Sequence, residues 1–193
     1  EGDGSEDMKE TLAVSMKKRL PWLIALLFLG MFVSSVVGMF EGIVSKVAIL
    51  VCFQSLILDM AGNVGTQSLA VTIRVLMDEE ITFKTRLALV WKEVKIGMAN
   101  GGLLGIVSFL CIGVYVWLFK GNSILYGFAV SACVGISLVL AMAISSFAGT
   151  VIPLFFHKIK VDPAVASGPL ITTINDLVAV VTYYGMAWLM LFH

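Results

Sequence analysis

Long apolar stretches separated by short polar segments dominate this chain of 193 residues. A bilayer core takes about 20 residues of apolar helix to cross, and five stretches reach that length. Most charged residues fall in the segments between them or before the first. The pattern predicts an all-α membrane protein with five transmembrane helices per protomer, at residues 21–40, 47–76, 96–119, 124–156 and 163–192.

The segments outside these spans are short and polar. Residues 1–10 are acidic and contain glycine, and they lack the apolar core of a signal peptide. We interpret residues 1–18 as a cytoplasmic tail or linker and residues 19–193 as one transmembrane domain. Residues 77–95 are rich in charge and predict a loop with a surface helix.

Composition and charge agree with a membrane location. Hydrophobic residues make up 59% of the chain and charged residues 13%, whereas soluble domains carry about 25% charged residues. A net charge of zero argues against nucleic acid as a partner. Of the 13 basic residues, only Lys46 and Lys120 fall on one side of the five-span scheme. The positive-inside rule then predicts a multi-pass protein of the cytoplasmic membrane, with its N-terminus cytoplasmic and its C-terminus outside.

Small residues inside the spans indicate helix packing. Gly97, Gly101 and Gly105 recur every four residues, a spacing that lets two backbones approach closely in lipid. The three cysteines lie in apolar runs without paired spacing, so we expect small buried hydrophobic side chains and not metal ligands or disulfides: Cys52, Cys111 and Cys133.

The last span carries the strongest candidate for a binding site. Gly168, Thr172 and Asp176 are four residues apart and share one face of a helix. Pro169 cannot donate an N–H, so it leaves a carbonyl upstream without its usual helical partner. Carboxylate, hydroxyl and carbonyl oxygens along one stripe suit a hard cation. The alternative is a buried aspartate that hydrogen-bonds a neighbouring helix.

The second span is interrupted by polar residues 62–67, with the sequence GNVGTQ. Such a segment lines a pore or coordinates an ion, or else it joins two helices by hydrogen bonds. Asp59 also lies deep in this span, where a charge needs a functional reason. Glu41, Glu93 and Asp162 fall near the predicted membrane edges, where ordinary interface charge is the competing interpretation.

The available ligands favour magnesium over softer metals. No histidine or cysteine lies beside Asp176, and zinc, copper and nickel prefer imidazole or thiolate. Magnesium gives up water reluctantly and is held through one or two carboxylates with several waters retained. A sparse site with one Asp per subunit fits that chemistry. The sequence has no phosphate loop or nucleophile motif, so we do not expect an enzyme.

Three segments resemble the transmembrane domain of the MgtE family of magnesium channels and transporters, which is related to eukaryotic solute carriers of the SLC41 type. They are residues 19–23 (RLPWL), residues 62–68 (GNVGTQS) and residues 162–176 (DPAVASGPLITTIND). The resemblance covers nearly everything after residue 19. It implies a homodimer whose ion pathway follows the two-fold axis, with transport of Mg²⁺ as the activity.

The resemblance also implies roles for individual residues. Asp176 of both subunits would form the central magnesium site. Backbone carbonyls of Gly168 and Thr172 would contribute to it, and Asn63 would lie near. The resemblance implies transported Mg²⁺, and Mn²⁺ or Co²⁺ are the alternative ions.

Further positions bear on regulation. The resemblance implies secondary Mg²⁺ sites at the cytoplasmic mouth that involve Asp162 and Glu93, so that Mg²⁺ would be regulatory there as well as transported. Asp59 departs from the family pattern; it adds a cation site or pairs with a basic side chain. The regulatory cytosolic domains that bacterial members carry are absent from this chain.

Two other functions stay open on the sequence. A proton- or sodium-coupled secondary transporter of a divalent cation would use Asp176 as a protonation site. A membrane scaffold without transport would use the polar segments only to hold helices together.

Overall fold

The computed structural model describes residues 11–78, 82–160 and 163–191, without the side chains of residues 43–44, 78 and 163–167. Within this part all regular secondary structure is helical. Five helices are long and apolar enough to cross a membrane, which agrees with the number of predicted spans. A short helix, α2, joins the first two. The elements are α1 (Leu12–Met39), α2 (Glu41–Val44), α3 (Ile49–Asp78), α4 (Phe83–Leu118), α5 (Ile124–Lys158) and α6 (Pro163–Leu191).

Two helices begin earlier than the apolar pattern predicted. Helix α1 starts at Leu12 instead of residue 21, and Pro21 lies inside it. Helix α4 starts at Phe83, so most of the segment that we expected to be a loop with a surface helix continues directly into the third span. The side chain of Thr82 accepts a hydrogen bond from the backbone N–H of Thr85 (3.3 Å) and caps this start. Lysine and arginine are good helix formers, so the charged residues before each apolar stretch are compatible with a helix that begins ahead of that stretch.

Helix α5 is the centre of the protomer. It packs against α3, α4 and α6, while α3 and α4 scarcely touch one another. The α4–α5 contact is close because it is built from small residues, as the glycine spacing predicted. A Cβ on Gly105 would lie 2.9 Å from the carbonyl oxygen of Gly135, and Gly101 lies equally tightly against the backbone of Val139.

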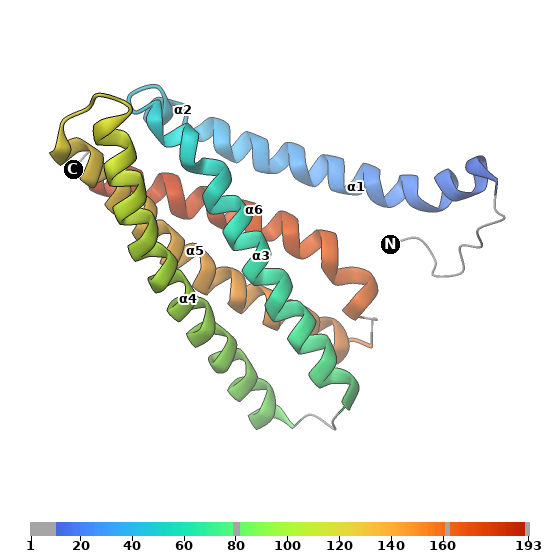
Figure 1. Ribbon diagram of the computed structural model, residues 1–193. Helices are drawn as coiled ribbons and strands as arrows, with labels where there is room; N and C mark the ends of the chain where they lie inside the picture. The colour runs from blue at the N-terminus through green and yellow to red at the C-terminus, as the bar shows by residue number, and fades with distance from the viewer. Residues whose placement is uncertain (1–10, 79–81, 161–162, 192–193) are drawn as a thin grey trace.

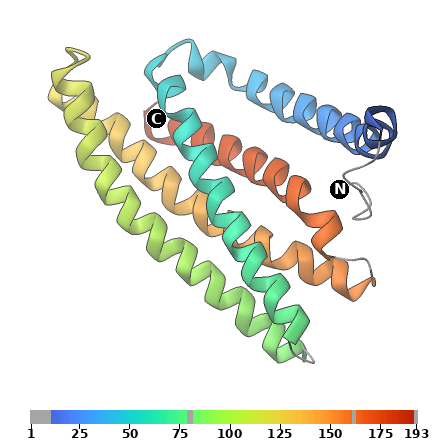
Figure 2. The same cartoon turned by 45° about the vertical axis from the view of Figure 1, so that its right-hand side comes forward.

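Helix α1 stands apart from this bundle (Figures 1 and 2). It contacts α6 and α2, and none of its residues is buried. Apart from its contacts with α6 and α2, the surface of α1 is therefore exposed along the helix.

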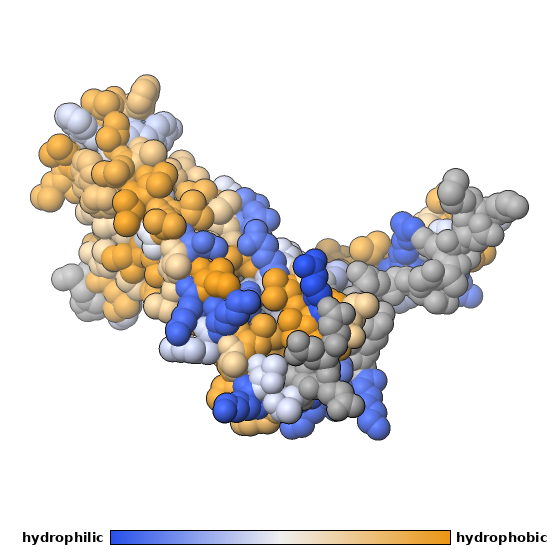
Figure 3. All heavy atoms as spheres, turned by 60° about the horizontal axis from the view of Figure 1, so that its bottom comes forward, coloured by the Kyte–Doolittle hydropathy of each residue, from blue (hydrophilic) through white to orange (hydrophobic). Residues whose placement is uncertain are grey.

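The surface is apolar along the flank of the bundle and polar at one end. Exposed large hydrophobic residues occur along all five long helices, among them Leu27, Leu103 and Val181. Figure 3 shows the bundle from the end at which α3 stops and α4 begins, and hydrophilic residues gather there. Burial of the cysteines was predicted wrongly for two of the three, because Cys52 and Cys111 face outward and only Cys133 is buried. In a membrane an apolar side chain gains little by turning away from lipid.

Candidate functional site

The two polar segments singled out in the sequence meet across one groove. This groove, which we call the α6 groove, has a volume of about 490 Å³ and lies between α1, α3 and α6. Thr66 comes from the GNVGTQ segment of α3, while α6 supplies the proline and its neighbours. The lining residues are Leu26, Thr66, Gly168, Pro169, Thr172 and Thr173. The structure thus brings Gly168 and Thr172 to the same space, as their spacing predicted.

The threonine hydroxyls of this groove are oriented by their own helices. Thr66 donates to the carbonyl oxygens of Gly62 (3.0 Å) and Asn63 (2.9 Å). Thr172 donates to the carbonyl of Gly168 at 3.1 Å. Since each hydroxyl proton is engaged with the backbone, the lone pairs of the oxygen are left to accept hydrogen bonds or to face a cation.

Asp176 lies one turn beyond Thr172 on α6 and is half-buried. It follows the lining residues in the four-residue series of one helix face. A carboxylate at this depth in a membrane span is costly without a partner. Asp176 therefore supplies the charge and the threonines supply neutral oxygens along the same side of α6.

Asn63 is on the other flank of α3. It lines a second groove of about 270 Å³ between α3 and α4, together with Gln67, Asn100 and Met142. The predicted neighbour of the α6 site thus does not line the α6 groove within one protomer.

Between the two grooves, α3 presents a polar face to the outside of the protomer. Asp59, Asn63, Thr66 and Gln67 are all exposed and follow helical spacing. Polar groups at membrane depth are tolerated where they face protein or a water-filled space, and they avoid lipid. The outer face of α3 must therefore meet water or another polypeptide.

Glu93 is buried, unlike the exposed polar residues of α3. It is 4% exposed, and its Oε2 accepts a hydrogen bond from the hydroxyl of Ser68 at 3.0 Å. This hydrogen bond is one of the few contacts between α3 and α4. Asp162, the other residue expected at the mouth, lies outside the described residues.

Two asparagines in these regions were not singled out from the sequence. Asn175 is fully buried, and within the described residues neither its Nδ2 nor its Oδ1 has a hydrogen-bond partner. Its side chain packs directly against Gly65, where a Cβ would collide with the amide. A glycine at position 65 is thus required for α3 to approach α6. The second is Asn100. Its position as a single amide in an apolar run is the feature of the sequence that could have identified it.

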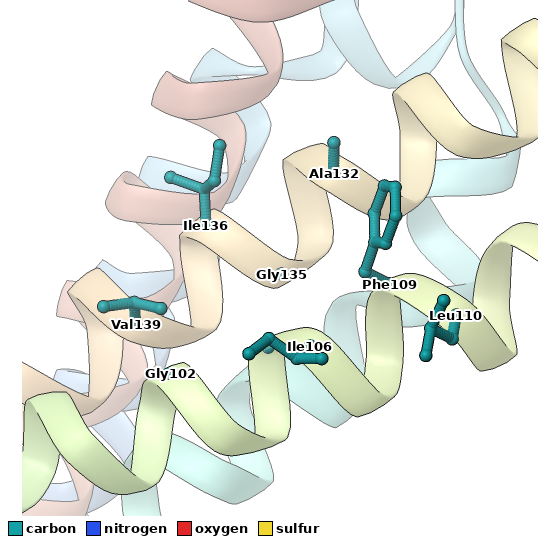
Figure 4. Close-up of a pocket in the computed structure, with 9 residues that line it drawn as sticks. Gly102, Ile106, Phe109, Leu110, Ala132, Gly135, Ile136 and Val139 are labelled. Atoms are coloured by element: carbon teal, nitrogen blue, oxygen red, sulfur yellow. The ribbon is translucent and has the colours of Figure 1, made fainter.

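A third cavity has no polar character. It occupies about 420 Å³ on the outer side of the α4–α5 contact, where Gly102 and Gly135 leave space beside Ile106, Phe109 and Val139 (Figure 4). A groove of this kind offers no ligand to an ion. The candidate site is therefore on the α3–α6 side.

The described residues offer few ligands that could hold a metal ion. Among the described residues, no three side chains of His, Cys, Asp or Glu come together in a way that could hold a metal ion. The α6 groove offers hydroxyl oxygens and one carboxylate near by. A divalent cation would require ligands from water or from a second protomer.

Comparisons with known proteins all identify the same family. The profile of the MgtE family, described as a divalent cation transporter, matches residues 54–186. The magnesium transporter MgtE of Bacillus subtilis (strain 168) is 42% identical over 174 residues, covering 90% of this chain and 37% of the relative. The magnesium transporter MgtE of Enterococcus faecalis (strain ATCC 700802 / V583) is 40% identical over 184 residues, covering 94% of this chain and 38% of the relative.

A more distant relative gives the same result. The magnesium transporter MgtE of Thermus thermophilus is 32% identical over 174 residues, covering 90% of this chain and 36% of the relative. The chain thus spans less than two-fifths of the length of these curated relatives.

Proposed function

Because the chain belongs to the MgtE family of divalent cation transporters, we propose that it forms the membrane part of a magnesium transporter, in which two copies enclose the ion pathway. Residues 19–193 are then one transmembrane domain in the cytoplasmic membrane. These relatives are all named as magnesium transporters, which supports Mg²⁺ as the transported ion. Mn²⁺ and Co²⁺ share its preference for oxygen ligands less strictly.

The observation that carries the proposal is the exposed polar surface of α3 and α6 at membrane depth. Thr66 and Thr172 lie on one groove, and Asp176 follows on the same side of α6. Lipid is an unfavourable neighbour for these groups. A second protomer facing this surface across a two-fold axis would exclude lipid and leave a hydrated path between the copies.

Charge and hydration explain how such a path selects Mg²⁺. Two Asp176 carboxylates on the axis carry a charge that one divalent ion neutralises, whereas a single Na⁺ or K⁺ leaves a net negative charge. Magnesium retains most of its waters in such sites. The hydroxyl and carbonyl oxygens at Thr172 and Gly168 are suited to accept hydrogen bonds from those waters.

The remaining acidic residues have a secondary role in this proposal. Asp162 and Glu93 are candidates for regulatory Mg²⁺ binding at the cytoplasmic mouth, although Glu93 must first leave its contact with Ser68. Asp59 is an additional ligand or ion-attracting charge on the outer face of α3. The distribution of basic residues supports a cytoplasmic N-terminus and an outer C-terminus.

The test is Mg²⁺ flux into liposomes that contain the purified chain, with an indicator dye inside. The parent chain should transport Mg²⁺, and Asp176→Asn should lose transport at least tenfold because it retains the shape and removes the charge. Glu41→Gln makes the same chemical change at an exposed position of α2 and should leave the flux intact.

Equal flux from Asp176→Asn and the parent would place the ion site elsewhere, with Asp59 as the next candidate. Flux that follows an imposed proton or sodium gradient in the parent would instead support the coupled transporter. No flux in the presence of a folded dimer would contradict the proposed function itself.

A further inference from the structure

A second set of polar side chains lies in the membrane, away from the α6 groove. Asn63 and Gln67 of α3 and Asn100 of α4 line one groove of about 270 Å³ whose floor includes Met142 of α5. All three amides are exposed, and each lies near the middle of its helix. The groove is open because α3 and α4 both pack on α5 and scarcely touch each other.

The packing of α4 against α5 does not explain why position 100 is an asparagine. This helix binds α5 through Gly97, Gly101 and Gly105, which are all buried, while Asn100 points to the neighbouring groove. It is the one polar side chain between Ile96 and Val107. An amide in such an apolar run loses free energy unless its donor and acceptor groups find partners.

The chemistry of three carboxamides narrows what can fill the groove. Hydrocarbon cannot satisfy them, and without a carboxylate among them they do not compensate the cost of stripping the water shell from Mg²⁺. Their carbonyl oxygens accept hydrogen bonds from water. A hydrated magnesium ion presents a shell of polarised O–H donors and parts with that shell reluctantly.

We propose that Asn100, together with Asn63 and Gln67, forms an outer-sphere contact for the hydrated divalent cation, and that Asn100 is a specificity-determining residue of the pathway. This inference rests on the proposed function. The amides hold the ion by its water shell before or after it meets Asp176, so a cation that sheds water easily gains less from them. This contact is a second binding position for the hydrated ion, located between α3 and α4.

The probe for this contact is hexaamminecobalt(III), an exchange-inert complex that imitates the size and the donor shell of hydrated Mg²⁺. It can bind only through its outer ligands. In liposome flux it should inhibit Mg²⁺ transport by the parent chain. Asn100→Leu, similar in size but without hydrogen-bonding groups, should raise the half-inhibitory concentration about tenfold, which corresponds to the loss of one charge-assisted hydrogen bond.

Two more variants sharpen the test. Asn100→Asp keeps the acceptor oxygens and adds charge, so it should lower the half-inhibitory concentration. Ser108→Ala removes a polar group on the same helix whose hydroxyl donates to the carbonyl of Leu104 at 2.7 Å, and it should have no effect on inhibition.

The outcomes separate the two proposals. A parent chain without Mg²⁺ flux would overturn the proposed function and this inference with it. A transporting parent whose inhibition is unchanged in both Asn100→Leu and Asn100→Asp would overturn the inference alone. If Asn100→Leu separates the protomers, and Asn100→Asp remains dimeric without tighter inhibition, the groove seats a helix of the second copy and the inference is also wrong.

Discussion

Among the polar side chains of the described residues, some are buried and join helices, and others are exposed and line grooves. Tyr183 donates its hydroxyl to the carbonyl of Leu50 at 2.8 Å, and Ser68 donates to Glu93 at 3.0 Å. Such groups have their partners inside the protomer. Thr172 and Asn100 face outward, so their oxygens are available to something outside it.

The Glu93–Ser68 pair should contribute to stability. Glu93→Ala leaves the hydroxyl of Ser68 without its acceptor and opens a cavity, which should lower the free energy of unfolding by about 1–3 kcal/mol. Glu93→Gln keeps an acceptor oxygen in nearly the same place and should cost less. Thermal unfolding of the purified protein in detergent measures both changes, with Glu41→Gln as the exposed control. An unchanged melting temperature for Glu93→Ala would show that the contact adds nothing.

The sequence identified residues that share one helix more readily than residues that meet across helices. Gly168 and Thr172 were placed together by their spacing alone, and they line one groove. The partner of Glu93 could not be predicted, because Ser68 is on another helix and reaches it only through the way α3 and α4 sit on α5. The burial of Asn175 against Gly65 depends on packing in the same way.

Among the helices, α4 and α5 form the closest pair because glycine replaces side chains along their contact. Their backbones meet at Gly105 and Gly135. Close approach increases dispersion contacts, which are a main source of helix association in lipid. The same lack of side chains leaves the apolar groove on the outer side of the pair (Figure 4).

Two neighbouring glycines of α4 should respond differently to the same change. Gly105→Ala would place a Cβ 2.9 Å from the carbonyl oxygen of Gly135, so the helices must separate. We expect a loss of about 1–3 kcal/mol, as for overpacking in a protein core. Gly102→Ala meets nothing within 4 Å and gains helix propensity, so its stability should stay the same or rise by up to about 1 kcal/mol.

Unfolding in detergent by a titrated denaturant compares the two variants with the parent. Equal effects at both positions would mean that α4 and α5 do not approach as closely as this structure has them.

At the level of elements, the length of the apolar stretches predicted the number of membrane helices and their approximate places. Their ends were less predictable. Helix α4 begins at Phe83 because Thr82 caps it and because Lys84 and Arg86 are compatible with a helix that projects from the membrane. An apolar window detects the part of a helix that lies in lipid, and this helix is longer than that part.

For the molecule as a whole, the surfaces that the proposed dimer would cover are exposed. One helix, α1, buries no residue, and the polar face of α3 lies beside an open groove with Asp176 near by. Sequence and protomer structure agree on a membrane helical bundle. The two-fold pore and the orientation in the membrane stay predictions, since they depend on a second copy and on the bilayer.

The proposed position of the ion path, beside the groove between α3 and α6, can be tested at Thr172. This residue is exposed and lines the groove. Thr172→Cys is placed in a chain whose native cysteines are replaced by alanine, and a positively charged thiol reagent is added during Mg²⁺ flux into liposomes. Lys120→Cys, at an exposed turn, is the control position.

We predict that the reagent blocks flux through Thr172→Cys, that Mg²⁺ slows this block, and that modified Lys120→Cys still transports. Full Mg²⁺ flux after complete modification of Cys at position 172 would contradict this prediction.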